Sequence, residues 1–304
     1  MNYEDFKQAF LAEMFLKAGG PGVEIYEHQV DKPNETWDAI SVRPAGSSIA
    51  SQIYYKDYYE EYKEGTPIPL LADSAVRNME LSRAQMPEVP EISHSFIEEN
   101  LYLTVLNYDM NRSWLSSVPH ERLEDMAVVP RVRVSEEASF AVKNPMLAGY
   151  GFSKKDLFKA AHANMDKQEY RCMSLSGMLM GFGLEPVTEM DPASNVYVLT
   201  NMSSVDGAAA ITSEKAMKQA RETIGEDFFI LPSSRHEVIL VPRSMSFSVA
   251  DLKDMVVSAN RTVVEDKDLL SDNVYRYNSS KGTIKMLEPK EEAKKLDRAL
   301  PPVL

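Results

Sequence analysis

Apolar residues near the N-terminus follow a helical period. Phe6, Phe10 and Met14 recur every four residues, which places them on one face of a helix. Asn2 is suited to cap the start of this helix, and Gly19 to end it. The first element predicted from the sequence is therefore an amphipathic helix.

A hairpin and two further helices are predicted next. The β-rich segments 23–30 and 37–42 flank the turn-forming sequence Asp-Lys-Pro-Asn at 31–34, which favours an antiparallel hairpin. Segments 54–64 and 67–86 then place apolar and aromatic residues at helical spacings. The proline-containing tract 86–93 breaks this pattern, so we expect a linker there.

The rest of the chain alternates between strand and helix patterns. In the middle, strands are predicted at 101–107, 126–134 and 138–142, and a capped helix at 153–165. A segment rich in Met, Gly and Pro, 178–192, is predicted to be a second linker. The last third predicts strands at 196–200, 207–211, 228–231 and 238–241, helices at 213–224 and from 248 to 259, and a hairpin of 274–277 with 283–286.

This order lacks a regular β-α-β alternation. It favours an α+β fold with mixed or antiparallel sheets and flanking helices. The expected regions, packed as one or two domains, are a helix-hairpin-helix region 1–90, a middle α+β region 91–190, a C-terminal α+β region 191–288 and a flexible tail 289–304.

Charge and cysteine content narrow the possible partners. The chain has 46 acidic and 33 basic residues and a net charge of -13, which opposes binding to nucleic-acid phosphates. The single cysteine, Cys172, excludes an intramolecular disulfide and a thiolate-rich zinc site. No apolar run is long enough to cross a bilayer, and the N-terminus is acidic where a signal peptide is basic. We therefore expect a cytoplasmic protein without membrane contact. We also expect no metal and no cofactor.

Several ordered segments resemble one protein family. The clearest are 196–211, 225–242 and 252–278, and the similarity continues upstream through 118–134 and 151–165. In these segments the chain resembles domain of unknown function 5688 (DUF5688), a family of uncharacterised proteins from anaerobic Firmicutes. A fainter similarity in segment order links it to the DUF1444 family. The resemblance implies a bacterial α+β protein and brings no established activity.

Two polar clusters are candidates for catalysis. Ser234, His236 and Glu237 lie between two apolar strands, and a serine and a histidine two residues apart share one face of a strand. No nucleophile-elbow motif accompanies them, so hydrogen bonding of the serines to local backbone is the alternative. His120 and Glu121 form a second polar pair, after a proline, where they also suit a turn. No histidines have metal-ligand spacing.

Two other features have a structural and a functional interpretation. The loop 201–207 either binds an anion or turns the chain, and it lacks the glycines and lysine of a phosphate loop. Cys172 follows an arginine that lowers thiol pKa values, yet no histidine is near it in sequence, which favours a passive thiol.

Tyrosines cluster in the predicted helix 54–64. Their spacing of three and four residues makes one helix face, which either packs into a core or recognises a partner. The candidate binding residues are Tyr55, Tyr58, Tyr59 and Tyr62.

These features support three hypotheses. The first is a non-catalytic protein-binding or regulatory accessory factor, which fits the acid excess and the tyrosine-rich helix. The alternative is a hydrolase that uses His236 with Ser234 or Glu237, or His120 with Glu121. The third is a mimic of nucleic acid that uses its acidic surface.

Overall fold

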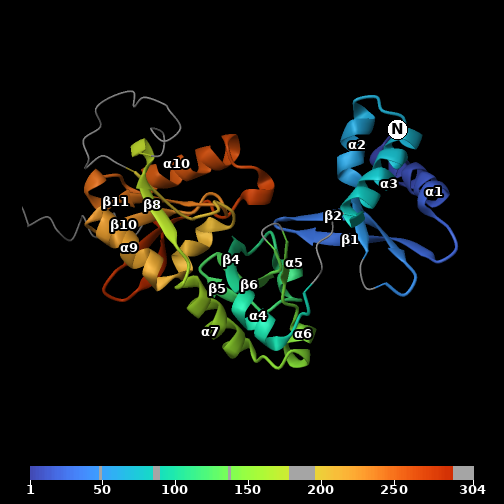
Figure 1. The fold of residues 1–304 in the computed structure, drawn as a ribbon. Coiled ribbons are helices and arrows are strands. Elements are labelled where there is room, and N and C mark those ends of the chain that lie inside the picture. The colour runs from blue at the N-terminus through green and yellow to red at the C-terminus, as the bar shows by residue number, and fades with distance from the viewer. Residues whose placement is uncertain (48–49, 85–89, 136–137, 178–195, 290–304) are drawn as a thin grey trace, which may run out of the picture. The chain divides into compact units, whose positions relative to one another are not determined.

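The computed structural model describes residues 1–47, 50–84, 90–135, 138–177 and 196–289 (Figure 1). The chain divides into two compact units, Met1–Pro90 and Glu91–Leu304, each with its own hydrophobic core. All sheets among the described residues are antiparallel, which confirms the predicted α+β fold. The predicted linker 178–192, most of the predicted tail and part of the tract 86–93 lie outside the described residues.

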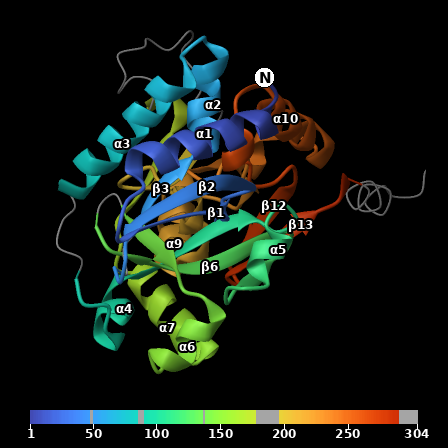
Figure 2. The same cartoon turned by 90° about the vertical axis from the view of Figure 1, so that its right-hand side faces the viewer.

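The N-terminal unit is a three-stranded sheet with three helices on one side (Figures 1 and 2). The strand order is β1-β2-β3, and Ile40 and Val42 of β2 share a core with Phe6, Phe10 and Leu71 of the helices. The elements are α1 (Tyr3–Ala18), β1 (Val23–Lys32), β2 (Glu35–Pro44), β3 (Ser51–Tyr54), α2 (Tyr55–Lys63) and α3 (Ile68–Ala84).

Local signals set the bounds of the first elements. The Asn2 side chain accepts a hydrogen bond from the Asp5 amide at 2.9 Å, and Gly19 ends α1, as predicted. The hairpin turns over two residues between Lys32 and Glu35, where Asn34 adopts a left-handed conformation with φ of 61°. Asparagine tolerates this conformation better than most residues, which explains the sharp turn.

A four-stranded sheet opens the C-terminal unit. β6 pairs with β4, β5 and β7. The helix α7 packs on β4, and α4 packs on α7 and β6, through buried apolar side chains. The elements are α4 (His94–Asn100), β4 (Leu101–Asn107), α5 (Arg112–Leu115), β5 (Glu121–Leu123), β6 (Met126–Arg133), β7 (Ser139–Ala141), α6 (Asn144–Gly149) and α7 (Lys154–Met165).

A six-stranded sheet of order β13-β12-β10-β11-β9-β8 completes this unit. α9 begins at the Ser213 cap and ends at Gly225, and α10 begins with a capping box of Ser248 and Asp251, all as predicted. The elements are β8 (Tyr170–Ser174), β9 (Tyr197–Asn201), η2 (Gly207–Thr212), α9 (Glu214–Ile224), β10 (Phe228–Leu231), β11 (Val238–Pro242), η3 (Arg243–Met245), α10 (Val249–Thr262), η4 (Asp266–Asp268), β12 (Val274–Asn278) and β13 (Thr283–Leu287).

The central strands of this sheet are buried on both faces. Phe228 and Ile230 of β10 join the core that contains α9, whereas Phe229 and Leu231 pack with α10. Two covered faces explain why the sequence of β10 is continuously apolar instead of alternating.

The segment 207–211, predicted as a strand, is instead part of the 3₁₀ helix η2. Its residues from Gly207 to Ile211 are buried, and η2 contacts both β4 and β9. Three consecutive alanines let the backbone pass between two sheets, where larger side chains would not fit. The prediction was wrong because the small side chains serve close tertiary packing and not strand pairing.

A half-buried carboxylate joins the two sheets of the C-terminal unit. Asp125, in the turn between β5 and β6, accepts hydrogen bonds from the Ser271 hydroxyl at 2.8 Å and the Asn273 amide at 2.9 Å. The Tyr275 hydroxyl of β12 also donates to Asp125. Burial, followed by the bond to Asp125, raises the pKa of Tyr275 well above its usual range.

We expect Tyr275→Phe to lower the free energy of unfolding of the C-terminal unit by about 2 kcal/mol, because Asp125 loses a charge-assisted donor. Hydrogen exchange of the amides in β10 and β12 measures this loss within the full chain. Tyr277→Phe removes a hydroxyl from the same strand outside the Asp125 network, and we expect a change below about 0.5 kcal/mol. Equal losses in the two variants would contradict a special role for the Asp125 contact.

Candidate functional site

The histidine of the predicted Ser-His cluster belongs to a group of interacting side chains. We call this group the polar node; its members are Asp206, Arg235, His236 and Asp268. The node joins the loop after β9, the loop between β10 and β11, and η4. Arg235 Nε lies 2.8 Å from Asp206 Oδ1, and both side chains are largely buried. The ion pair therefore holds two loops together.

Every polar group of His236 has a hydrogen-bond partner. Its Nε2 lies 3.0 Å from Asp268 Oδ1, and its Nδ1 accepts a hydrogen bond from the Asp206 amide at 3.3 Å. Its carbonyl accepts from the Thr200 hydroxyl at 2.8 Å. The acceptor role of Nδ1 assigns the ring proton to Nε2, facing Asp268.

The structure does not direct the Ser234 hydroxyl at the His236 ring. Ser234 Oγ accepts the backbone N–H of His236 at 3.0 Å, the local hydrogen bond expected of a serine in a turn. Glu237 is partly exposed just before β11. The contacts of Ser234 and His236 thus position backbone, and neither group is free to activate the other.

The loop 201–207 closes against the polar node. Asp206 is left-handed, with φ of 55°, and the Ala208 amide donates to the Arg235 carbonyl at 3.1 Å. A Cβ atom on Gly207 would lie 2.0 Å from Thr200 Oγ1 and 2.4 Å from the His236 carbonyl oxygen. Only glycine allows this approach of two backbones.

Gly207→Ala is expected to lower the free energy of unfolding of the C-terminal unit by about 3 kcal/mol, because backbone must move to admit the methyl group. Urea denaturation of the full chain measures the change. Gly149→Ala in α6 is the matched control, since nothing lies within 4 Å of the added Cβ. A Gly207→Ala variant as stable as the control would show that the loops adjust freely.

The side chains of the second predicted pair, His120 and Glu121, contact different partners. His120 Nδ1 lies 3.1 Å from the Val118 carbonyl oxygen, so the ring orders its own turn. The Glu121 carboxylate lies 3.9 Å from His162 Nε2 of α7. Among the described residues, no group of three or more His, Cys, Asp or Glu side chains is arranged to hold a metal ion.

The four tyrosines of α2 pack toward α1. Tyr55 is fully buried and donates to Glu27, and burial raises its pKa well above the usual range. Tyr58 stacks on Phe10 with ring centroids 5.1 Å apart. Tyr59 and Tyr62 are partly buried against Phe6, at 5.1 and 5.2 Å. Their rings contribute to the core of the N-terminal unit.

Cys172 lies on β8 and is partly buried. Burial raises the pKa of its thiol to about 11, opposite to the shift that activates a nucleophilic cysteine. The adjacent Arg171 contacts Met202 instead of the thiol, with 3.3 Å between Arg171 Nε and Met202 Sδ.

A thiol with a pKa of about 11 is ionised to only about one part in a thousand at pH 8. We therefore expect an aromatic disulfide reagent to label Cys172 at least about tenfold more slowly in the native chain than in urea. The labelling rate should still be rising at pH 9.5. Fast native labelling that levels off below pH 8 would contradict the raised pKa.

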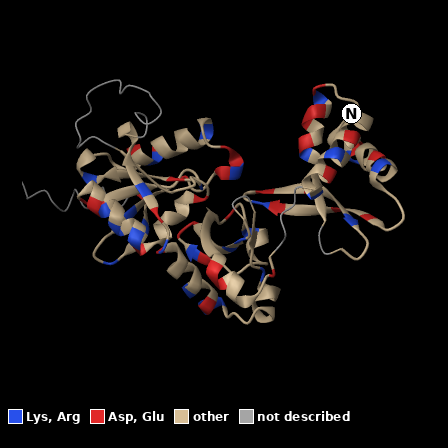
Figure 3. Ribbon diagram, viewed as in Figure 1, with Lys and Arg blue, Asp and Glu red and all other residues tan. Residues whose placement is uncertain are grey.

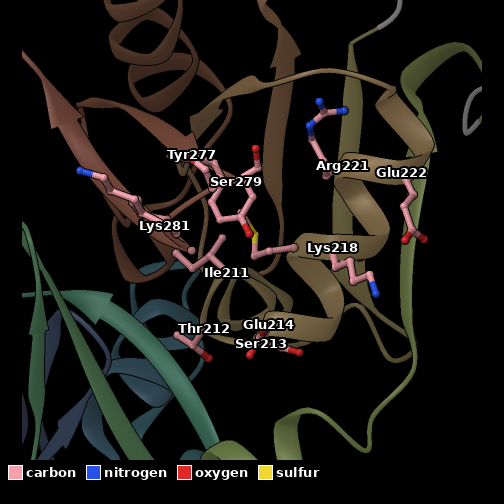
Figure 4. A pocket seen from close by; sticks show the side chains of 14 residues that line it. Ile211, Thr212, Ser213, Glu214, Lys218, Arg221, Glu222, Tyr277, Ser279 and Lys281 are labelled. Atoms are coloured by element: carbon pink, nitrogen blue, oxygen red, sulfur yellow. The ribbon is translucent and has the colours of Figure 1, made fainter.

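Sequence reasoning did not find a hollow in the C-terminal unit, a groove of about 740 Å³ between α9 and the β12–β13 hairpin (Figure 4). We call it the α9 groove. Lys218 and Arg221 extend from α9 on one side, and Lys281 extends from the hairpin on the other. Its lining also includes Glu214, Glu222, the hydroxyl residues Thr212, Ser213, Ser279 and Ser280, and the apolar or aromatic residues Ile211, Met217, Tyr277 and Ile284.

The charges of the α9 groove are unevenly neutralised. Arg221 Nε lies 3.4 Å from Asp227, which also accepts a hydrogen bond from Ser279 at 2.9 Å. Lys218 and Lys281 make no ion pair with any described residue. Acidic and basic residues are otherwise interspersed over both units (Figure 3). Two unpaired ammonium groups in one hollow are therefore a local feature.

A second hollow, of about 620 Å³, lies between α1 and α3 in the N-terminal unit. Its lysine, Lys17, is paired with Asp73 at 2.5 Å. The α9 groove is the stronger candidate for a binding site because its lysines have no such partner.

Comparison with known protein families gives one match. The model of a family of unknown function, DUF5688, matches residues 3–279. The chain belongs to the DUF5688 family. No curated protein and no solved structure matches it. No helix within the described parts of the chain has both the length and the apolar character needed to cross a membrane.

Proposed function

We propose that this protein is a non-catalytic binding factor that holds another protein in the α9 groove. The observation that carries the proposal is the pair of unpaired lysines, Lys218 and Lys281, on either side of an apolar floor. A hollow that combines apolar side chains with charged and hydroxyl groups is suited to recognition of a partner.

The polar node supports a binding role over a hydrolytic one. A serine hydrolase requires a hydroxyl within hydrogen-bond reach of a histidine nitrogen that can take its proton. Here both nitrogens of His236 have partners in Asp268 and the Asp206 amide, and Ser234 is bonded to backbone. The contacts of the node connect three loops, as expected of a structural element and not of a catalytic centre.

The tyrosine-rich helix is a weaker candidate for the binding surface. Its tyrosines are largely occupied with α1, and the side chains left facing solvent are charged, such as Glu60 and Glu61. Exposed charges alone contribute little to affinity. The proposed surface is therefore on the C-terminal unit.

Photo-crosslinking tests this proposal. The chain carries p-benzoylphenylalanine in place of Ser280, at the rim of the groove, and is irradiated in lysate of its native host. We expect one protein to crosslink reproducibly. The matched control carries the same group in place of Lys285, an exposed residue of the same hairpin outside the groove lining, and should not capture this protein. Identical products at both positions, or none at position 280, would overturn the proposal.

A further inference from the structure

The α9 groove has features that define the chemistry of its occupant. Lys218 is on the helix and Lys281 is in the hairpin turn, so the two side chains lie on opposite sides of the groove. Their charge is not compensated within the described structure, whereas that of Arg221 is compensated by Asp227. An occupant with two separated negative charges would satisfy both lysines.

The floor between the lysines is apolar. Met217, Tyr277 and Ile211 line the groove as buried core residues, and Ile284 beside them is partly exposed. Burying an apolar side chain of an occupant here would add to the binding free energy in proportion to the area removed from water. The occupant therefore needs an apolar group between its negative charges.

The rim offers hydrogen-bonding groups suited to a peptide backbone. Thr212, Ser279 and Ser280 belong to the groove lining. Each hydroxyl already donates its proton within the chain, so its oxygen is left to accept. Peptide N–H groups that enter the groove need such acceptors in place of water. An extended segment of polypeptide presents N–H groups to them along its length.

Acidic residues of the groove argue against a polyanion. Glu214 lies at one end, close enough to Tyr277 that, after burial, its charge is the next largest cause raising the pKa of that tyrosine. Glu222 also belongs to the lining, and the whole chain carries a net charge of -13. A nucleic-acid strand with a charge at every phosphate would meet repulsion at these positions, whereas a peptide can leave them uncharged.

We propose that the α9 groove binds an extended acidic segment of another protein, in which two carboxylates contact Lys218 and Lys281 and an apolar side chain between them covers the floor. This inference rests on the proposed function, because it names the partner chemistry of the same groove. The Glu214 end of the groove takes a neutral or basic residue of the segment, which fixes the direction in which the segment lies.

Peptide binding measured by fluorescence polarisation tests the inference. The probes are labelled peptides of about ten residues, a length of ~34 Å when extended, which share a central Leu-Phe pair. Their flanking residues are glutamate, serine or lysine, and a single-stranded thymidine oligonucleotide of similar length is a fourth probe. The full chain is compared with a Lys218→Glu, Lys281→Glu double variant and with Lys285→Glu, a control outside the groove lining.

We expect the glutamate peptide to bind most tightly, with an affinity that falls as salt is added. The double variant should bind it at least about tenfold more weakly and should prefer the lysine peptide, whereas Lys285→Glu should change its affinity less than about twofold.

Equal binding of the serine peptide, preference for the oligonucleotide, or an unchanged double variant would overturn the acidic-segment inference. A crosslink at position 280 would then still support a protein partner of different chemistry. If neither a crosslink nor peptide binding is seen, both the inference and the proposed function are wrong.

Discussion

The C-terminal unit depends on the close approach of Gly207 to the backbone of His236. This contact lets η2 pass between β4 and β9, so that the alanines after Gly207 fill the space between two sheets. The ion pair of Arg235 with Asp206 and the bonds of His236 to Asp206 and Asp268 hold the three surrounding loops in the required positions. The polar side chains of the node thereby stabilise the apolar packing of η2 against β4 and β9.

The sequence predicts elements best where the determining interactions are local. Capping by Asn2, Ser213 and Ser248 acts within three residues, and the bounds of α1, α9 and α10 follow from it. The strand β8 was missed because its neighbour β9 follows only after residues 178–195, and because Met173, an apolar residue at an exposed position, hides the alternation in its sequence. η2 was assigned as a strand because small apolar residues give no periodic signal.

The candidate site shows the same division. The density of polar residues drew attention to Ser234 and His236, but the contacts of the His236 ring are with Asp206 and Asp268, which are remote in the sequence. The α9 groove has even less of a pattern in the sequence that could predict it. Lys218 lies on the exposed side of an amphipathic helix, and Lys281 lies in an ordinary hairpin turn, so each looks like a solvated charge by itself. Only tertiary packing of the hairpin beside α9 makes them lining residues of one groove.

The distribution of the two cores has a consequence for synthesis on the ribosome. The core of the N-terminal unit is formed entirely by residues from Phe6 to Met79, so it can close while the remainder is still being translated. The main core of the C-terminal unit instead combines β4 with β12, near opposite ends of that unit. Its early strands must wait, with apolar surface exposed, until β12 has left the exit tunnel. This interval is when a nascent chain of this architecture is most dependent on chaperones and most vulnerable to aggregation.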